Sequence, residues 1–284
     1  MKVLVTGASG NVGRYVSEEL INMGEQIVVA GMNTQKLTEL FQENAEVVYF
    51  DFTNPDTFEK ALANVDRVFL MRPPHLGKPE DLYPFIDAMK KAQIKLVSFL
   101  SLMGVEKNPI PPHHKIEKYI EVSGIPFAHI RPGFFMQNIS GIHAVEIREK
   151  NEVFVPARKS KTSFIDAKDI GFATAIVLHE YNKYENTAHT ITGSKALDYY
   201  EVAEILTNIT GRKIRYAKPS YLQYRKYYIN TRGLNKDYVN VTVALYFMTR
   251  MGTAKMVTDD FYQLTGKQPR TFEQFVKENI QSFS

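Results

Sequence analysis

The sequence contains no cysteine. This absence excludes disulfide bonds, thiol catalysis and cysteine-ligated zinc or iron–sulfur sites, and it fits a reducing cytoplasm, where we expect the protein to act. No apolar run approaches the length of a membrane span, and the first predicted strand already begins at Lys2. We therefore expect neither a membrane segment nor a signal peptide. The sequence also has no repeat and no low-complexity tract, and we predict no metal-binding residues.

Charge of one sign is not in excess either, because the net charge of +4 is small and spread along the 284 residues. It suits an anionic cofactor but is too diffuse to indicate nucleic acid. The basic, tyrosine-rich stretch 221–228 could stack on bases or pack against a substrate cleft. Interleaved acids at Glu201, Glu204 and Asp237 favour the cleft. We expect a small-molecule substrate, no nucleic-acid or membrane partner, and a monomer or homodimer.

The most informative stretch is the first thirty residues. An apolar, β-branched run at 2–6 precedes the glycine-rich segment 7–13, an amphipathic segment at 14–23, Gly24 and a second apolar run at 26–30. This pattern predicts a βαβ unit. Gly7 would let the chain leave the strand sharply, Gly10 would let backbone N–H groups approach a pyrophosphate, and Gly13 would let the helix pack closely. The start of the helix would then donate to phosphates, so we predict dinucleotide binding.

Strands and helices continue to alternate up to about residue 193. This alternation predicts an α/β fold, a doubly wound parallel sheet of the dinucleotide-binding Rossmann kind, with right-handed crossovers. After Ser194 helical patterns dominate, which predicts a small, mostly helical substrate domain. The predicted division is 1–135 and 162–193 for the dinucleotide-binding domain, and 136–161 and 194–284 for the substrate-binding domain.

The residues at the carboxyl ends of the predicted strands should line the cofactor, because ligands of open α/β sheets lie there. The turn at Asn33 carries no acid that would repel a 2′-phosphate, so we expect NADP(H), with NAD also possible. Lys36 could contact that phosphate or be a solvated helix charge, and Arg72 could contact phosphate or substrate or be an exposed loop charge. The predicted cofactor-binding residues are Gly7, Ser9, Gly10, Asn11, Val12, Gly13, Asn33, Lys36, Asp51, Phe52, Met71 and Arg72.

Three aromatic residues are candidates for substrate contact. Phe134 and Phe135 follow the predicted strand at 127–132 and could close over a nicotinamide ring, although paired phenylalanines often belong to a core. Tyr224 lies in the tyrosine-rich stretch. Asp166 and Asp169 look like helix-start carboxylates rather than an acid–base pair.

Taken together, these motifs resemble the NmrA-like branch of the atypical short-chain dehydrogenase/reductases over nearly the whole chain. The matching residues are 7–13, Asp51, Ser101, 113–117, 123–126, 131–133, 135–138 and 166–170. The resemblance implies a Rossmann core with a small, interleaved substrate domain. The group includes NAD(P)H:quinone oxidoreductases and nucleotide-sensing regulators.

The sequence departs from the better-known members of that group in its catalytic motif. Those enzymes use a tyrosine followed four residues later by a lysine, and no tyrosine of this sequence has a lysine at that spacing. With Glu117 as the register mark, His113 stands at the lysine position and Pro109 at the tyrosine position. Ser101 stands near the position of the active-site serine.

Two functions therefore remain open. We predict an oxidoreductase that transfers hydride from NADPH to a quinone or similar small electrophile, with His113 and Ser101 as catalytic residues. His113 could donate a proton or hydrogen-bond the nicotinamide ribose. The alternative is a non-catalytic NADP(H)-sensing regulator that acts through protein partners.

Overall fold

The computed structural model describes residues 1–284, which form two compact units. Unit 1 comprises residues 1–132, 167–191 and 260–267, and unit 2 comprises residues 133–166, 192–259 and 268–284. No helix in either unit combines the length and apolar character that a membrane crossing needs.

Unit 1 is built on a seven-stranded sheet in which every neighbouring pair of strands is parallel. The strand order β10-β6-β5-β4-β1-β2-β3 reverses direction at β1, as in a doubly wound fold. This arrangement confirms the predicted fold class. The strands are β1 (Lys2–Thr6), β2 (Ile27–Gly31), β3 (Glu46–Tyr49), β4 (Val65–Met71), β5 (Leu96–Leu100), β6 (Phe127–Pro132) and β10 (Thr187–Ile191).

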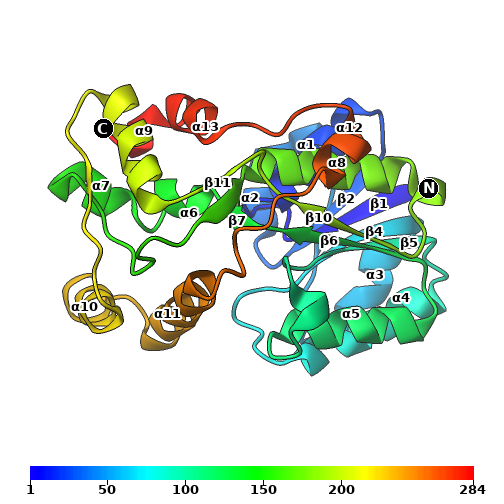
Figure 1. The fold of residues 1–284 in the computed structure, drawn as a ribbon. Helices are drawn as coiled ribbons and strands as arrows, with labels where there is room; N and C mark the ends of the chain where they lie inside the picture. The colour runs from blue at the N-terminus through cyan, green and yellow to red at the C-terminus, as the bar shows by residue number, and fades with distance from the viewer. The chain divides into compact units, whose positions relative to one another are not determined.

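Helices cover both faces of this sheet (Figure 1). One face carries α1 (Gly13–Asn22), α8 (Ala167–His179) and α12 (Asp260–Thr265), and the other carries α3 (Phe58–Leu62), α4 (Tyr83–Lys91) and α5 (Pro112–Ser123). Helix α2 (Thr34–Phe41) joins β2 to β3, and 3-10 turns occur at Gln42–Asn44, Pro55–Thr57, Pro79–Leu82, Val105–Lys107 and Tyr181–Lys183.

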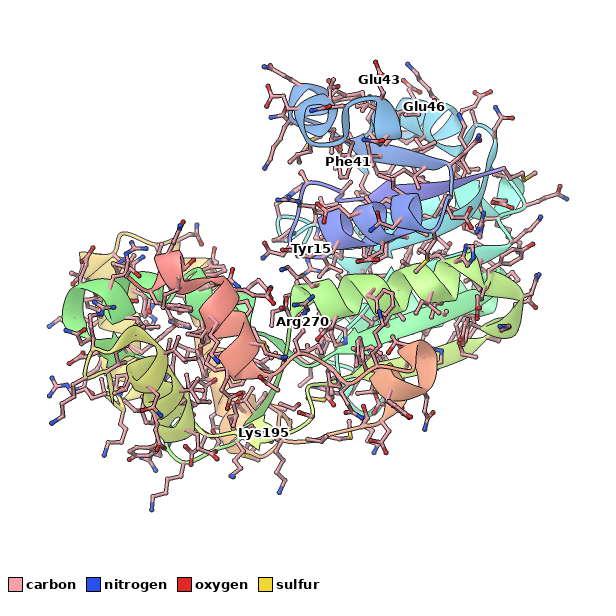
Figure 2. All side chains as sticks on the ribbon, turned by 90° about the horizontal axis from the view of Figure 1, so that it is seen from above. Tyr15, Phe41, Glu43, Glu46, Lys195 and Arg270 are labelled. Atoms are coloured by element: carbon pink, nitrogen blue, oxygen red, sulfur yellow. The ribbon has the colours of Figure 1, made fainter.

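Two close contacts fix these layers. Figure 2 looks onto α1 and α8, which run side by side, with Tyr15 on α1. A Cβ on Gly171 of α8 would lie 2.4 Å from the Cβ of Tyr15, so only glycine permits this approach. On the opposite face, the rings of Phe50, Phe58 and Phe85 pack within 5.8 Å of one another, centroid to centroid.

Unit 2 is mostly helical and carries two small sheets. Its helices are α6 (Gln137–Ser140), α7 (Ala144–Lys150), α9 (Tyr199–Thr210), α10 (Tyr221–Lys226), α11 (Lys236–Arg250) and α13 (Phe272–Glu278), with a π-helical turn at Tyr227–Thr231 and a 3-10 turn at Ile280–Ser282. One sheet holds β7 (Phe134–Phe135), β9 (Thr162–Ile165) and β11 (Ala196–Leu197), and the other holds β8 (Glu152–Val153) and β12 (Arg215–Tyr216).

Helix α12 belongs to unit 1, although the sequence-based division placed residues 194–284 together. The Asp260 carboxylate accepts a hydrogen bond of 2.6 Å from the backbone N–H of Thr190 on β10, and α12 packs on α8. This contact joins residues 70 positions apart, so no local pattern indicates it. The assignment of dinucleotide and substrate binding to separate parts of the chain stays a prediction.

Candidate functional site

The glycine-rich loop between β1 and α1 is shaped by close backbone contacts. Gly7 has a φ of +65°, and its carbonyl accepts from the N–H of Gly10 at 2.9 Å. A Cβ on Gly13 would lie 2.3 Å from the carbonyl oxygen of Gly7, which no side chain could tolerate without displacing backbone. Gly13 therefore allows the helix to begin directly against the start of the loop.

The same loop leaves an open helix start for an anion. Helix α1 has no side-chain cap and no acid in its first turn. An α-helix leaves its first N–H groups without intrahelical partners, although that of Arg14 donates to the Gly10 carbonyl at 3.2 Å, and the dipole of the helix favours negative charge at this end. Ser9, Gly10 and Asn11 are exposed, while Val12 is buried and anchors the loop. These residues fit a dinucleotide pyrophosphate, because Gly10 presents bare backbone where phosphates would approach.

The turn after β2 is arranged as a helix start. The side-chain oxygen of Asn33 caps α2 by accepting from the N–H of Lys36 at 2.9 Å. The Lys36 ammonium is exposed and makes no ion pair. Arg14, in contrast, is paired with Glu18 at 2.7 Å. Lys36 therefore has no carboxylate competing for its charge, whereas Arg14 shares its charge with Glu18.

Asp51 and Phe52 follow β3 but differ in what they can offer a ligand. The Asp51 carboxylate accepts from the N–H and the hydroxyl of Thr53, both at 2.8 Å. The Phe52 ring is only 8 % exposed and packs edge-on against Phe50. Phe52 is thus a core residue whose backbone, rather than ring, lies at the strand tip.

Met71 and Arg72 lie at the carboxyl end of β4. The Met71 thioether packs over Gly7, where it occupies the place that a Cβ would take. The Arg72 guanidinium donates through Nη1 to the carbonyl oxygens of Pro73 and Leu76, and it has no carboxylate in ion-pair range. Its Nε is buried and has no hydrogen-bond partner. Burial lowers the pKa of Arg72, although a guanidinium stays charged in proteins.

Ser101 immediately follows β5, the neighbour of β4. Met71 and Leu100 are paired in the sheet, so Arg72 and Ser101 leave it side by side. Ser101 is 5 % exposed, and its hydroxyl has no hydrogen-bond partner. A buried, unpaired hydroxyl is costly unless a ligand or water completes it.

His113 begins α5 and faces the same strand tips. Its ring lies 6.0 Å from that of Phe99, centroid to centroid, and its Nδ1 is buried without a partner. Burial, and then the charge of Arg72, lower the pKa of His113 to about 3. The ring is therefore neutral near pH 7. It retains the ability to donate or accept a hydrogen bond.

The structure thus brings together three enclosed polar atoms at one edge of the sheet: Arg72 Nε, Ser101 Oγ and His113 Nδ1. Each is left without a partner by the chain itself. An edge of this kind, next to a glycine-rich loop, is where ligands of open α/β sheets bind. The residues fit the oxygen atoms of a ribose or of a small acceptor molecule.

The three predicted substrate residues lie in unit 2 and differ in burial. Phe134 and Phe135 form β7 and are half-buried, and Phe134 packs against the core of the unit. Tyr224 is 1 % exposed, with its ring 4.4 Å from that of Tyr228. Other aromatic rings surround the Tyr224 ring, so Tyr224 is a core residue rather than a side chain free to contact a substrate.

Sequence reasoning missed a buried polar network in unit 2. The two ring nitrogens of His143 lie 2.8 Å from the hydroxyls of Tyr228 and Tyr246, and Tyr228 donates to Glu146 at 2.9 Å. Arg232 pairs with the other oxygen of Glu146. Because the partners lie about 80 to 100 residues apart, only the folded chain reveals the network.

Comparisons with known proteins agree with this architecture. The model of the NmrA-like family matches residues 1–275. The chain is 33 % identical to the prestalk A differentiation protein A of Dictyostelium discoideum, over all of this chain and 94 % of that protein. It is 29 % identical to the NAD(P)H azoreductase of Xenophilus azovorans, over 99 % of both chains. The fold is also similar to that of an Escherichia coli NADPH-dependent quinone oxidoreductase crystallised with NADPH, with a TM-score of 0.89. The two sequences are 22 % identical, and the match covers 98 % of this chain and 99 % of that one.

Proposed function

Because this chain belongs to the NmrA-like family, we propose that it is an NADPH-dependent reductase of small molecules, with a quinone as its acceptor. The observation that carries the proposal is the set of three unpartnered polar atoms beside the glycine loop. The azoreductase and the quinone oxidoreductase among its similar proteins favour turnover over cofactor sensing alone.

Residues of unit 1 would hold the cofactor. The loop from Gly7 to Gly13 and the start of α1 would bind the pyrophosphate, and Lys36 would meet the 2′-phosphate. Asp51 and Met71 would lie along the adenosine and the nicotinamide halves, respectively. When bound, NADPH supplies the hydride, and the protein supplies orientation and a dry site.

The charge at Arg72 indicates the acceptor class. Arg72 is a half-buried cation without a carboxylate partner, and the neighbouring His113 is neutral. Such an edge stabilises an oxygen that gains negative charge, as a quinone carbonyl does when it takes up hydride. It disfavours an acceptor that is already cationic. Ser101 and His113 would hold the oxygen or the ribose by hydrogen bonds, while water protonates the product.

Titration of the purified protein with NADPH and NADH, followed by their oxidation with a benzoquinone or a cationic triphenylmethane dye, tests this function. We expect tighter binding of NADPH and faster turnover of the quinone. In Arg72→Met, kcat/KM for the quinone should fall by roughly 100-fold, the typical effect of losing one oxyanion donor. His75→Gln, an exposed change in the same loop, is the matched control.

The outcomes separate the two functions. Tight NADPH binding without oxidation by several acceptors would contradict the reductase and favour the sensor. Equal loss of quinone and dye turnover in Arg72→Met, together with weaker NADPH binding, would place Arg72 on the cofactor instead.

A further inference from the structure

A second cluster of ligating side chains lies between α5 and β6 of unit 1. Glu117 and Glu121 are one helical turn apart on α5, and His129 lies on the adjacent strand β6. Carboxylate and imidazole atoms of the three residues lie within 4.8 Å of one another. Glu117 and His129 are buried, and Glu121 is partly exposed.

His129 is the unexplained member of this cluster. It is fully buried, with its ring stacked on Phe127 at 4.5 Å, and neither ring nitrogen makes a hydrogen bond. An imidazole enclosed in this way carries a substantial desolvation cost that a partner would remove. Its Nε2 points toward Glu121, with 3.5 Å between Nε2 and Oε1.

That separation is long for a hydrogen bond but suits two ligands of one cation. Ligand atoms about 2.1 Å from a tetrahedral zinc ion lie about 3.4 Å apart. Mixed imidazole and carboxylate ligands favour zinc-class cations, whereas magnesium and calcium favour oxygen alone. We propose that Glu121 and His129 bind a divalent cation of the zinc class, with Glu117 as the third ligand.

The surrounding charges both shape and oppose this site. Arg131 donates to both oxygens of Glu117, at 3.0 and 2.7 Å, which fixes the carboxylate as hydrogen bonds often fix metal ligands. The charge of Arg131 is partly offset by Glu106, 3.5 Å away. Lys118 pairs with Glu121 Oε2 at 2.6 Å and competes with a cation for that carboxylate.

Calorimetric titration of the chelator-treated full chain with Zn²⁺ tests the proposal. We expect the wild type to bind one more zinc ion than Glu121→Gln or His129→Gln. His75→Gln, which removes an exposed histidine, should bind as many as the wild type. Lys118→Met should bind several-fold more tightly, because it removes the competing ammonium; a purely structural role of Glu121 would not produce this gain.

Two results of this titration would overturn the proposal. An unchanged number of zinc ions in Glu121→Gln, or no zinc binding by the wild type, overturns the proposal. Glu121 is partly exposed, so its variant remains informative even if the buried His129→Gln protein does not fold.

Discussion

Gly10 and Gly13 lie three residues apart, yet a side chain would meet different surroundings at each. A Cβ on Gly13 would lie 2.3 Å from the Gly7 oxygen, whereas one on Gly10 would lie 3.2 Å from the same atom and face solvent. Gly13→Ala should therefore lower the free energy of unfolding by about 1–3 kcal/mol, the usual cost of overpacking, as measured by urea denaturation.

Gly10→Ala provides the matched comparison. It should lose at most about 1 kcal/mol of stability, since its methyl group would lie 3.2 Å from the Gly7 oxygen, a contact that a small shift of the exposed loop can relieve. Its affinity for NADPH should nevertheless fall at least about tenfold, because the methyl group would separate the loop from the phosphates. Wild-type affinity in a folded Gly10→Ala protein would contradict the placement of the pyrophosphate.

At the scale of elements, one cluster of ion pairs links strand β4 to the residues before β2 and to the end of α8, at the amino-terminal edge of the sheet. Arg67 on β4 pairs with both oxygens of Glu25 at 2.8 and 2.9 Å and donates to the carbonyl of Leu178 at the end of α8. Arg67→Met would remove this cation from Glu25 and Asp66, which would keep only His179 and Lys95, respectively, as partners. Its free energy of unfolding should fall by about 3 kcal/mol, the lower end of the range for broken buried pairs.

The control for that prediction is NADPH affinity. The cluster lies at the opposite strand ends from the glycine loop, so the dissociation constant of the folded variant should stay unchanged. A stability loss below about 1 kcal/mol would show that Arg67 acts as a weak surface pair instead.

Elements with strong local patterns could be predicted from the sequence. The glycine loop, the parallel strands and the Asp198 cap of α9 all follow from adjacent residues, and each is present in the structure. What the sequence could not predict is which side chains become buried and what surrounds them. The low pKa of His113 comes first from its burial and then from the charge of Arg72, 41 positions away, and the Tyr224 ring is enclosed by Phe154, Tyr228 and Tyr246.

For the whole molecule, the same burial predicts sensitivity to mild acid. Burial lowers the pKa of His113 in unit 1 and of His143 in unit 2 to about 3, with Arg72 and Arg232 as the respective secondary causes. In the unfolded chain both have a pKa near 6.5, so between these values the unfolded state binds more protons. Stability therefore falls as the pH falls below 6.5, by about 2 kcal/mol per histidine at pH 5.

Urea denaturation between pH 8 and pH 5 measures this loss, and His143→Gln isolates one share of it. Glutamine takes up no proton, so the stability of the variant should depend less steeply on pH below 6.5 than that of the wild type. Above pH 7 the variant should be less stable, because its amide cannot reproduce both hydrogen bonds to Tyr228 and Tyr246. The two curves should therefore converge as the pH falls. Parallel curves would mean that His143 takes up no extra proton on unfolding, and that its hydrogen bonds alone determine its contribution.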